Sequence, residues 1–89
     1  MDRKQRIEAC LREALAPEVV EVIDDSARHA GHSGAREGGQ THYRLRIVAA
    51  RFAGLSRVAR HRLVFDALKG EFAGGLHALN IEAEAPGGA

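Results

Sequence analysis

Hydrophobic residues recur at helical spacing in the first fifteen residues of the chain. The apolar side chains that share one helical face are Ile7, Leu11, Ala14 and Leu15. Asp2 can cap the N-terminus of such a helix, and Pro17 prevents its continuation. The pattern therefore predicts an amphipathic helix over residues 2–15, with Cys10 beside the apolar stripe as a small core residue.

Two segments with strand character follow, separated by a glycine-rich stretch. Residues 19–23 are rich in valine and isoleucine, which favours a strand. Residues 26–40 hold four glycines and show no hydrophobic period, which predicts a loop. Residues 41–48 alternate polar and apolar side chains, as in a half-buried strand. The side chains expected to face inward from this strand are Tyr43, Leu45 and Ile47.

The second half of the chain predicts a turn, a helix and a third strand. Gly54 marks the turn, and Ser56 is a suitable N-cap for a helix that runs to about Phe72. The side chains expected on the buried face of this helix are Val64, Phe65, Leu68 and Phe72, with His61 one turn earlier. Residues 76–83 alternate again. The strand expected there would place Leu79, Ile81 and Ala83 on one side.

The predicted order is helix–strand–strand–helix–strand, an α/β (α+β) fold. The first two strands can pair as a hairpin, and the strand–helix–strand crossover favours a parallel third strand. We expect a three-stranded mixed sheet with both helices on one face. A chain of 89 residues has room for a single domain, residues 1–89, with its core over about 3–84 and a frayed tail over 85–89.

Composition and motifs narrow the classes of function. Hydrophobic residues make up 45% of the chain and charged residues 28%, as in a globular domain and unlike a disordered chain. No stretch approaches the ~20 apolar residues of a membrane helix, and no export signal is present, so we expect a cytoplasmic protein without a membrane partner. The chain has no nucleophile elbow, phosphate-binding loop or paired carboxylates. We therefore expect neither enzymatic activity nor a small-molecule substrate.

Positive charge is concentrated in the middle of the sequence. Residues 44–65 contain six arginines and no acidic residue. Such a block suits either an acidic or nucleic-acid partner, or a solvated face balanced by carboxylates elsewhere in the fold. Arg57, Arg60 and Arg62 are the candidate contacts. They cannot all face one groove, because positions 60 and 62 diverge on a helix.

The five histidines carry the clearest candidate chemistry, because neutral imidazole is a common metal ligand. His29 and His32 lie in the predicted loop, His42 and His77 begin predicted strands, and His61 lies in the second helix. The sequence has no CxxC or HxxxH pair, so the chain cannot hold a cluster or a structural zinc ion unaided. We expect a structural role for His61, with its ring joining helix and sheet by one hydrogen bond.

Two longer segments resemble the signature of the BolA family. One is Arg-Phe-Ala-Gly-Leu-Ser-Arg-Val-Ala-Arg-His-Arg-Leu-Val over residues 51–64, and the other is Gly-Gly-Leu-His-Ala-Leu-Asn-Ile over residues 74–81. Residues 20–26 and 41–45 resemble the family in the same order, so the similarity covers about residues 3–84. The resemblance implies the family's α-β-β-α-β fold, which is related to the class II KH-like fold. It also implies partnership with a monothiol glutaredoxin.

The same resemblance implies a [2Fe–2S] cluster shared with the glutaredoxin and glutathione, and none in the isolated chain. The family's His-Ala-Leu ligand falls on His77. Its loop ligand falls best on His29, with His32 as the alternate. The loop lacks cysteine, so the sequence is similar to the subgroup with a histidine in the loop. A DNA-binding transcriptional regulator that uses the Arg44–Arg62 block is the alternative function, because such a role is also associated with the family.

Overall fold

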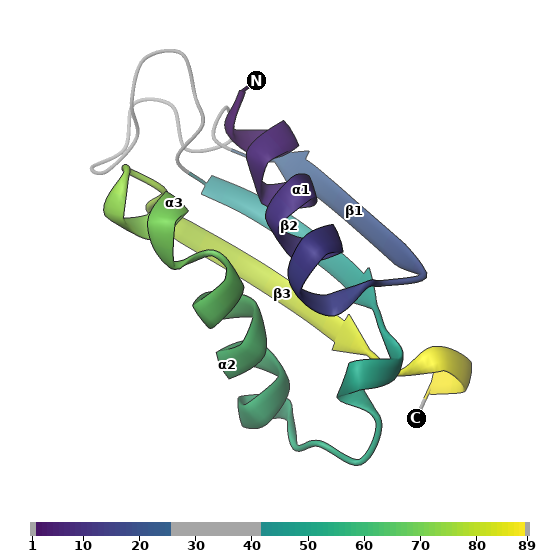
Figure 1. Ribbon diagram of the computed structural model, residues 1–89. Helices are drawn as coiled ribbons and strands as arrows, with labels where there is room; N and C mark the ends of the chain where they lie inside the picture. Colours follow the sequence, from purple (N-terminus) through teal and green to yellow (C-terminus); the bar gives the residue numbers. More distant parts are fainter. Residues whose placement is uncertain (1, 26–41, 89) are drawn as a thin grey trace.

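The computed structural model describes residues 2–25 and 42–88, which follow the predicted order of elements (Figure 1). The elements are α1 (Arg3–Leu15), β1 (Val19–Asp24), β2 (His42–Val48), the 3-10 helix η2 (Ala50–Phe52), α2 (Arg57–Ala67), α3 (Lys69–Ala73), β3 (Ala78–Glu84) and the 3-10 helix η3 (Pro86–Gly88). The loop predicted over residues 26–40 lies outside the described residues.

The first helix begins and ends where the sequence predicts. The Asp2 side chain accepts a hydrogen bond from the Gln5 backbone N–H, and the Asp2 N–H donates to the Gln5 side chain, both at 2.9 Å. This capping box satisfies two backbone groups at the helix start. Ala14 is exposed, so its predicted place on the buried face is wrong. Cys10 packs against the core as a half-buried side chain, as expected.

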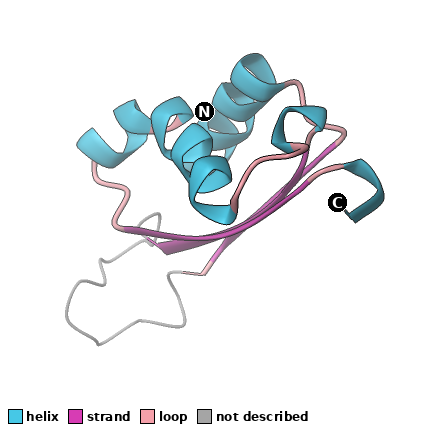
Figure 2. Cartoon of the chain, turned by 90° about the horizontal axis from the view of Figure 1, so that it is seen from below, coloured by secondary structure: helices cyan, strands magenta, loops and turns pink. Residues whose placement is uncertain are grey.

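The sheet has the predicted mixed topology, in the order β1-β2-β3. β1 and β2 are antiparallel, and β2 and β3 are parallel. The helices all lie on one face of the sheet, and no described element covers the opposite face (Figure 2). The predicted inward residues of β2 are confirmed, because Tyr43, Leu45 and Ile47 are all buried.

The second predicted helix is divided into two. α2 ends at Ala67, and α3 begins at Lys69 after a change of backbone direction at Leu68. Gly70 lies just beyond the break and costs about 1 kcal/mol in a helix interior relative to alanine, which weakens a continuous helix there. The break leaves Leu68 fully buried.

Phe65 is 42% exposed, so its predicted burial is wrong. Adjacent helical positions diverge by about 100°, and at this point Val64 occupies the core. The Phe65 ring instead lies against the Phe72 ring, with centroids 5.3 Å apart.

The hydrophobic core lies between the helices and the sheet. Its largest fully buried side chains are Ile7, Leu11, Leu45, Ile47, Phe52, Val64 and Leu68. The predicted frayed tail is wrong at Ala85, which is 2% exposed and belongs to the core cluster. The Ala85 carbonyl also accepts a hydrogen bond from the Gly88 N–H at 3.1 Å.

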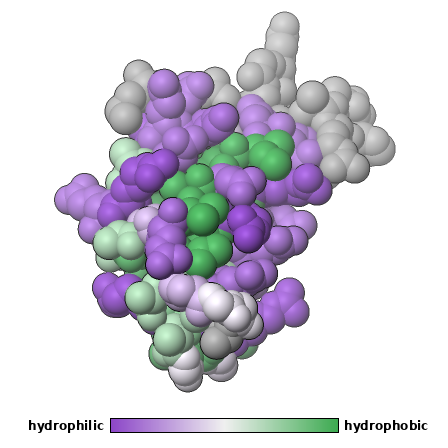
Figure 3. Space-filling model, turned by 90° about the vertical axis from the view of Figure 1, so that its right-hand side faces the viewer, coloured by the Kyte–Doolittle hydropathy of each residue, from purple (hydrophilic) through white to green (hydrophobic). Residues whose placement is uncertain are grey.

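β1 forms one edge of the sheet, and hydrophobic surface surrounded by hydrophilic side chains is visible on that side of the molecule (Figure 3). Ile23 of this strand is 48% exposed. Within residues 2–25 and 42–88, no helix is both long and apolar enough to cross a membrane.

Candidate functional site

Two histidines lie side by side where β2 and β3 begin. His42 is the first residue of β2, and His77 immediately precedes β3. The strands are parallel, and His42 pairs with Ala78, so both histidines reach the same edge of the sheet. Their ring centroids are 5.3 Å apart, and the ring planes are inclined by 30°. The topology therefore brings together two imidazoles that are 35 positions apart in the numbering.

His77 is exposed, as we predict for a metal ligand that reaches a partner. The backbone is fixed on both sides of it. Leu76 is 4% exposed, and its N–H donates to the Glu71 carbonyl at 2.9 Å, while Ala78 enters the sheet. The sequence places His77 inside the third strand, but β3 starts one residue later. His77 therefore lies just outside the strand, in which every second side chain faces the helices.

The backbone at His42 is also held in place by its neighbours. Its carbonyl accepts a hydrogen bond from the Asp25 N–H at 2.8 Å, and the next side chain, Tyr43, is buried. Burial raises the pKa of Tyr43 to about 12, and the nearby Asp24 carboxylate adds to this effect. Asp25 and His42, the described residues before and after the segment 26–41, therefore lie next to each other at the end of the sheet that carries the histidine pair.

The predicted loop ligands His29 and His32 lie outside the described residues. Their place relative to His77 therefore stays a prediction. His42, in contrast, was not selected as a ligand from the sequence. The signal was present, because parallel pairing of two strands that each begin with a histidine places both histidines at one edge.

The described residues do not form a complete set of metal ligands. They include no group of three or more histidine, cysteine or acidic side chains placed to hold a metal ion. Cys10, the chain's single cysteine, lies in α1 against the core. Iron–sulfur clusters are held mainly by thiolates, so the packing of Cys10 leaves the imidazole nitrogens of His42 and His77 as the candidate metal ligands at this end of the sheet.

An ionic cluster fixes the segment that leads to His77. The Glu71 carboxylate accepts two hydrogen bonds from Arg6 Nε at 3.1 Å each, and Arg3 Nε lies 3.6 Å from the same carboxylate. Arg3 Nη2 also donates to the Gly74 carbonyl at 3.0 Å. These contacts join α1 to Glu71 of α3 and to Gly74, which lie six and three residues before His77. Tertiary packing brings these side chains together, and no motif in the sequence predicts the cluster.

The predicted hydrogen bond from His61 to the sheet is wrong. His61 is half-buried in a groove between α2 and β3, and its ring makes no hydrogen bond with any residue that the structure describes. Its neighbour Arg60 makes the connection instead. Arg60 Nε donates to the Leu55 carbonyl at 3.0 Å, and Nη1 donates to the Ala83 carbonyl of β3 at 3.1 Å. The longer arginine side chain reaches the strand from the helix.

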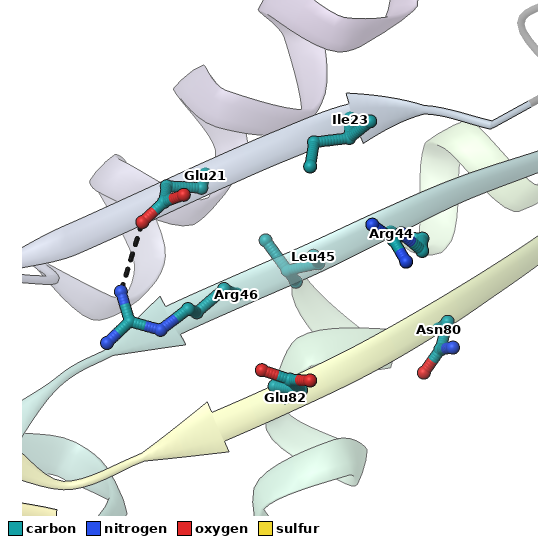
Figure 4. Close-up of a pocket in the computed structure, with 7 residues that line it drawn as sticks. All are labelled: Glu21, Ile23, Arg44, Leu45, Arg46, Asn80 and Glu82. Atoms are coloured by element: carbon teal, nitrogen blue, oxygen red, sulfur yellow. Dashed lines mark hydrogen bonds and ion pairs between the residues drawn. The ribbon is translucent and has the colours of Figure 1, made fainter.

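The remaining arginines of the basic block are spread over separate surfaces. Arg44 and Arg46 lie on the sheet face opposite the helices, where Arg46 pairs with Glu21 at 3.0 Å (Figure 4). Arg57 lines the groove beside His61, whereas Arg62 lines a different hollow with Asp66. The arginines of consecutive elements therefore lie on different faces of the molecule.

Comparison with known proteins identifies the family. A family model described as BolA-like protein matches residues 11–87. An uncharacterised Sinorhizobium protein is 51% identical and the match covers 98% of this chain and 95% of that protein. The mouse BolA-like protein 1 is 46% identical over 90% of this chain, which spans 56% of the mouse protein.

The solved structure of the BolA domain of SufE1 from Arabidopsis thaliana superposes with a TM-score of 0.86 and 46% identity, covering 97% of this chain and 94% of that domain. The agreement extends over the helices and the mixed sheet alike. This chain belongs to the BolA-like family.

Proposed function

We propose that this chain is a non-enzymatic accessory protein in iron–sulfur cluster or iron handling. It binds a monothiol glutaredoxin and supplies His77 as a ligand to a [2Fe–2S] cluster shared with the glutaredoxin and glutathione. The observation that carries the proposal is the exposed His77 ring, presented from a backbone that is fixed by the core on one side and by the sheet on the other.

The chemistry of the chain agrees with a partial ligand set. Bound histidine nitrogens in place of thiolates raise the reduction potential of a [2Fe–2S] cluster. This chain would contribute nitrogen only, because its cysteine packs against the core. Leu76 and the Glu71 cluster limit the movement of the backbone before His77, so little conformational entropy is lost when the ring binds.

The second protein ligand of the shared cluster belongs to the segment 26–41. We propose His29 for it, with His32 as the alternate, on the basis of the family resemblance. The positions of Asp25 and His42, the described residues on either side of that segment, support this choice, since both lie at the end of the sheet where His77 is exposed. Replacement of His29 should weaken the complex less than replacement of His77, because His32 lies only three residues away.

DNA binding is the less favoured function. Arg60 is engaged with two backbone carbonyls, and Arg44 and Arg57 lie on different surfaces. The described arginines therefore do not form the continuous basic face that tracks a phosphate backbone.

Complex formation tests the proposed function. The chain is mixed with a cluster-loaded monothiol glutaredoxin and glutathione, and the mixture is separated by size-exclusion chromatography with detection of visible absorbance. We expect the wild type and the control His61→Ala to co-elute with the cluster and the glutaredoxin, and His77→Ala to elute alone. Far-UV circular dichroism establishes that each variant is folded. Co-elution of His77→Ala with an unchanged spectrum would refute the assignment.

A further inference from the structure

We propose that His42 and His77 form a two-imidazole site for a borderline divalent cation, Zn²⁺ or Cu²⁺, in the isolated chain. This site is distinct from the shared cluster, since it uses His42 and needs neither a glutaredoxin nor the segment 26–41. It does share His77 with the proposed function, so the two kinds of metal compete for that ring.

The distance between the rings carries the proposal. With metal–nitrogen bonds of about 2.0–2.1 Å and a tetrahedral angle, two imidazoles on one ion have centroids about 5 Å apart. The observed separation of 5.3 Å matches this value before any ion is bound. The strand register fixes the positions of the two backbones relative to each other.

The surroundings suit a hydrated cation. His77 is exposed and His42 is half-buried, so water molecules can complete the coordination sphere from the solvent side. An acidic residue lies next to the pair, since the Asp25 N–H donates to the His42 carbonyl at 2.8 Å. Arg44 lies two residues after His42 on the same face of β2, whereas Arg3 and Arg6 of α1 contact the Glu71 carboxylate.

The choice of cation follows from the donor atoms. Imidazole nitrogens suit zinc, copper, iron and nickel, whereas calcium and magnesium require oxygen ligands. Cu²⁺ binds most tightly in the divalent series and is therefore the best probe, and Zn²⁺ is the ion to use in competition.

Ring stacking without metal binding is the competing explanation for the distance between the His42 and His77 rings. The centroids of stacked aromatic pairs are also roughly 4.5–7 Å apart. Replacement by phenylalanine separates the two. His42→Phe keeps a flat ring against His77 but removes the nitrogen, and His77→Phe does the reverse. His61→Phe is the matched control, since His61 lies in the groove beside α2.

The test titrates the isolated chain with Cu²⁺ by isothermal calorimetry and counts bound nitrogens by electron paramagnetic resonance. We expect one ion with two nitrogen ligands in the wild type, in His61→Phe and in the double variant His29→Ala/His32→Ala. His42→Phe and His77→Phe should each bind at least tenfold more weakly. The site is refuted if the wild type does not bind, if His42→Phe binds as tightly as the wild type, or if the double loop variant loses binding.

These titrations contain no glutaredoxin, so their failure leaves the proposed function untouched. A second experiment measures the competition itself. Zn²⁺ added to the chain before the cluster-loaded glutaredoxin should reduce complex formation by the wild type at concentrations at least tenfold lower than for His42→Phe. Equal sensitivity of the two chains would show that Zn²⁺ does not act through this pair.

Discussion

At the scale of single residues, two neighbours on α2 have different roles. Arg60 donates to the carbonyls of Leu55 and Ala83, whereas the His61 ring makes no hydrogen bond within residues 2–25 and 42–88. Arg60→Met removes both bonds and keeps most of the aliphatic stem, so we expect a loss of about 1–3 kcal/mol in the free energy of unfolding. His61→Ala should cost less than about 1 kcal/mol. Urea denaturation at neutral pH measures both, and the reverse ranking would contradict these roles.

The buried phenol of Tyr43 should make stability depend on alkaline pH. The folded chain retains the phenolic proton up to a pKa of about 12, whereas the unfolded chain releases it near pH ~10. The stabilising contribution is therefore complete below about pH 10 and is lost as the pH rises toward 12. Between about pH 9 and pH 11 the wild type should lose about 1 kcal/mol more than Tyr43→Phe. Urea denaturation of both chains at each pH tests this, and equal losses would refute it.

At the scale of elements, the Glu71 cluster connects α1 to α3. The Glu71 and Arg3 side chains are 14% and 12% exposed, so their charges are less screened than those of a surface pair. Glu71→Gln keeps the shape and removes the charge. We expect it to lower the free energy of unfolding by about 1–2 kcal/mol, because two arginines would then lie together without a carboxylate.

The matched control is Glu13→Gln, which changes an exposed carboxylate of α1. It should alter the free energy of unfolding by less than about 0.5 kcal/mol. Equal effects of the two variants in urea denaturation would show that the Glu71 contacts do not stabilise the pairing of the helices.

Local signals predicted most elements, and tertiary packing decided the others. The Asp2 cap and the alternation in residues 41–48 are properties of short segments, and the structure confirms both. The division of the second helix at Leu68 could not be read from periodicity. Its apolar residues continue at helical spacing across the break. The break itself lies at Leu68, whose side chain is fully buried in the core.

At the scale of the whole molecule, the basic block is divided between both faces of the sheet. Arg44 and Arg46 lie on the open face, while Arg57 and Arg62 belong to the helical layer. We therefore expect duplex DNA to bind only weakly and without sequence preference, with a dissociation constant of about 10⁻⁴–10⁻⁶ M at physiological salt. Fluorescence anisotropy with labelled duplexes measures this. Saturable, sequence-dependent binding at nanomolar concentration would contradict the distribution of charge.

The candidate site was predictable only in part. Family resemblance selected His77, and the structure places it exposed at the edge of the sheet. The sequence also predicted that the last two strands are parallel, but a single histidine at the start of β2 is uninformative until the register of His42 with Ala78 is known. The bond assigned to His61 was misplaced by one residue, because reach from helix to strand depends on side-chain length and helix position together.

The most direct test of the central claim detects histidine nitrogen on the shared cluster. The chain is labelled with ¹⁵N-histidine, combined with unlabelled monothiol glutaredoxin and glutathione, reduced, and studied by pulsed electron paramagnetic resonance. We expect strong ¹⁵N hyperfine coupling in the wild type and in His61→Ala, and its loss or marked reduction in His77→Ala. A reduced cluster in the wild-type complex without ¹⁵N coupling would contradict ligation by this chain.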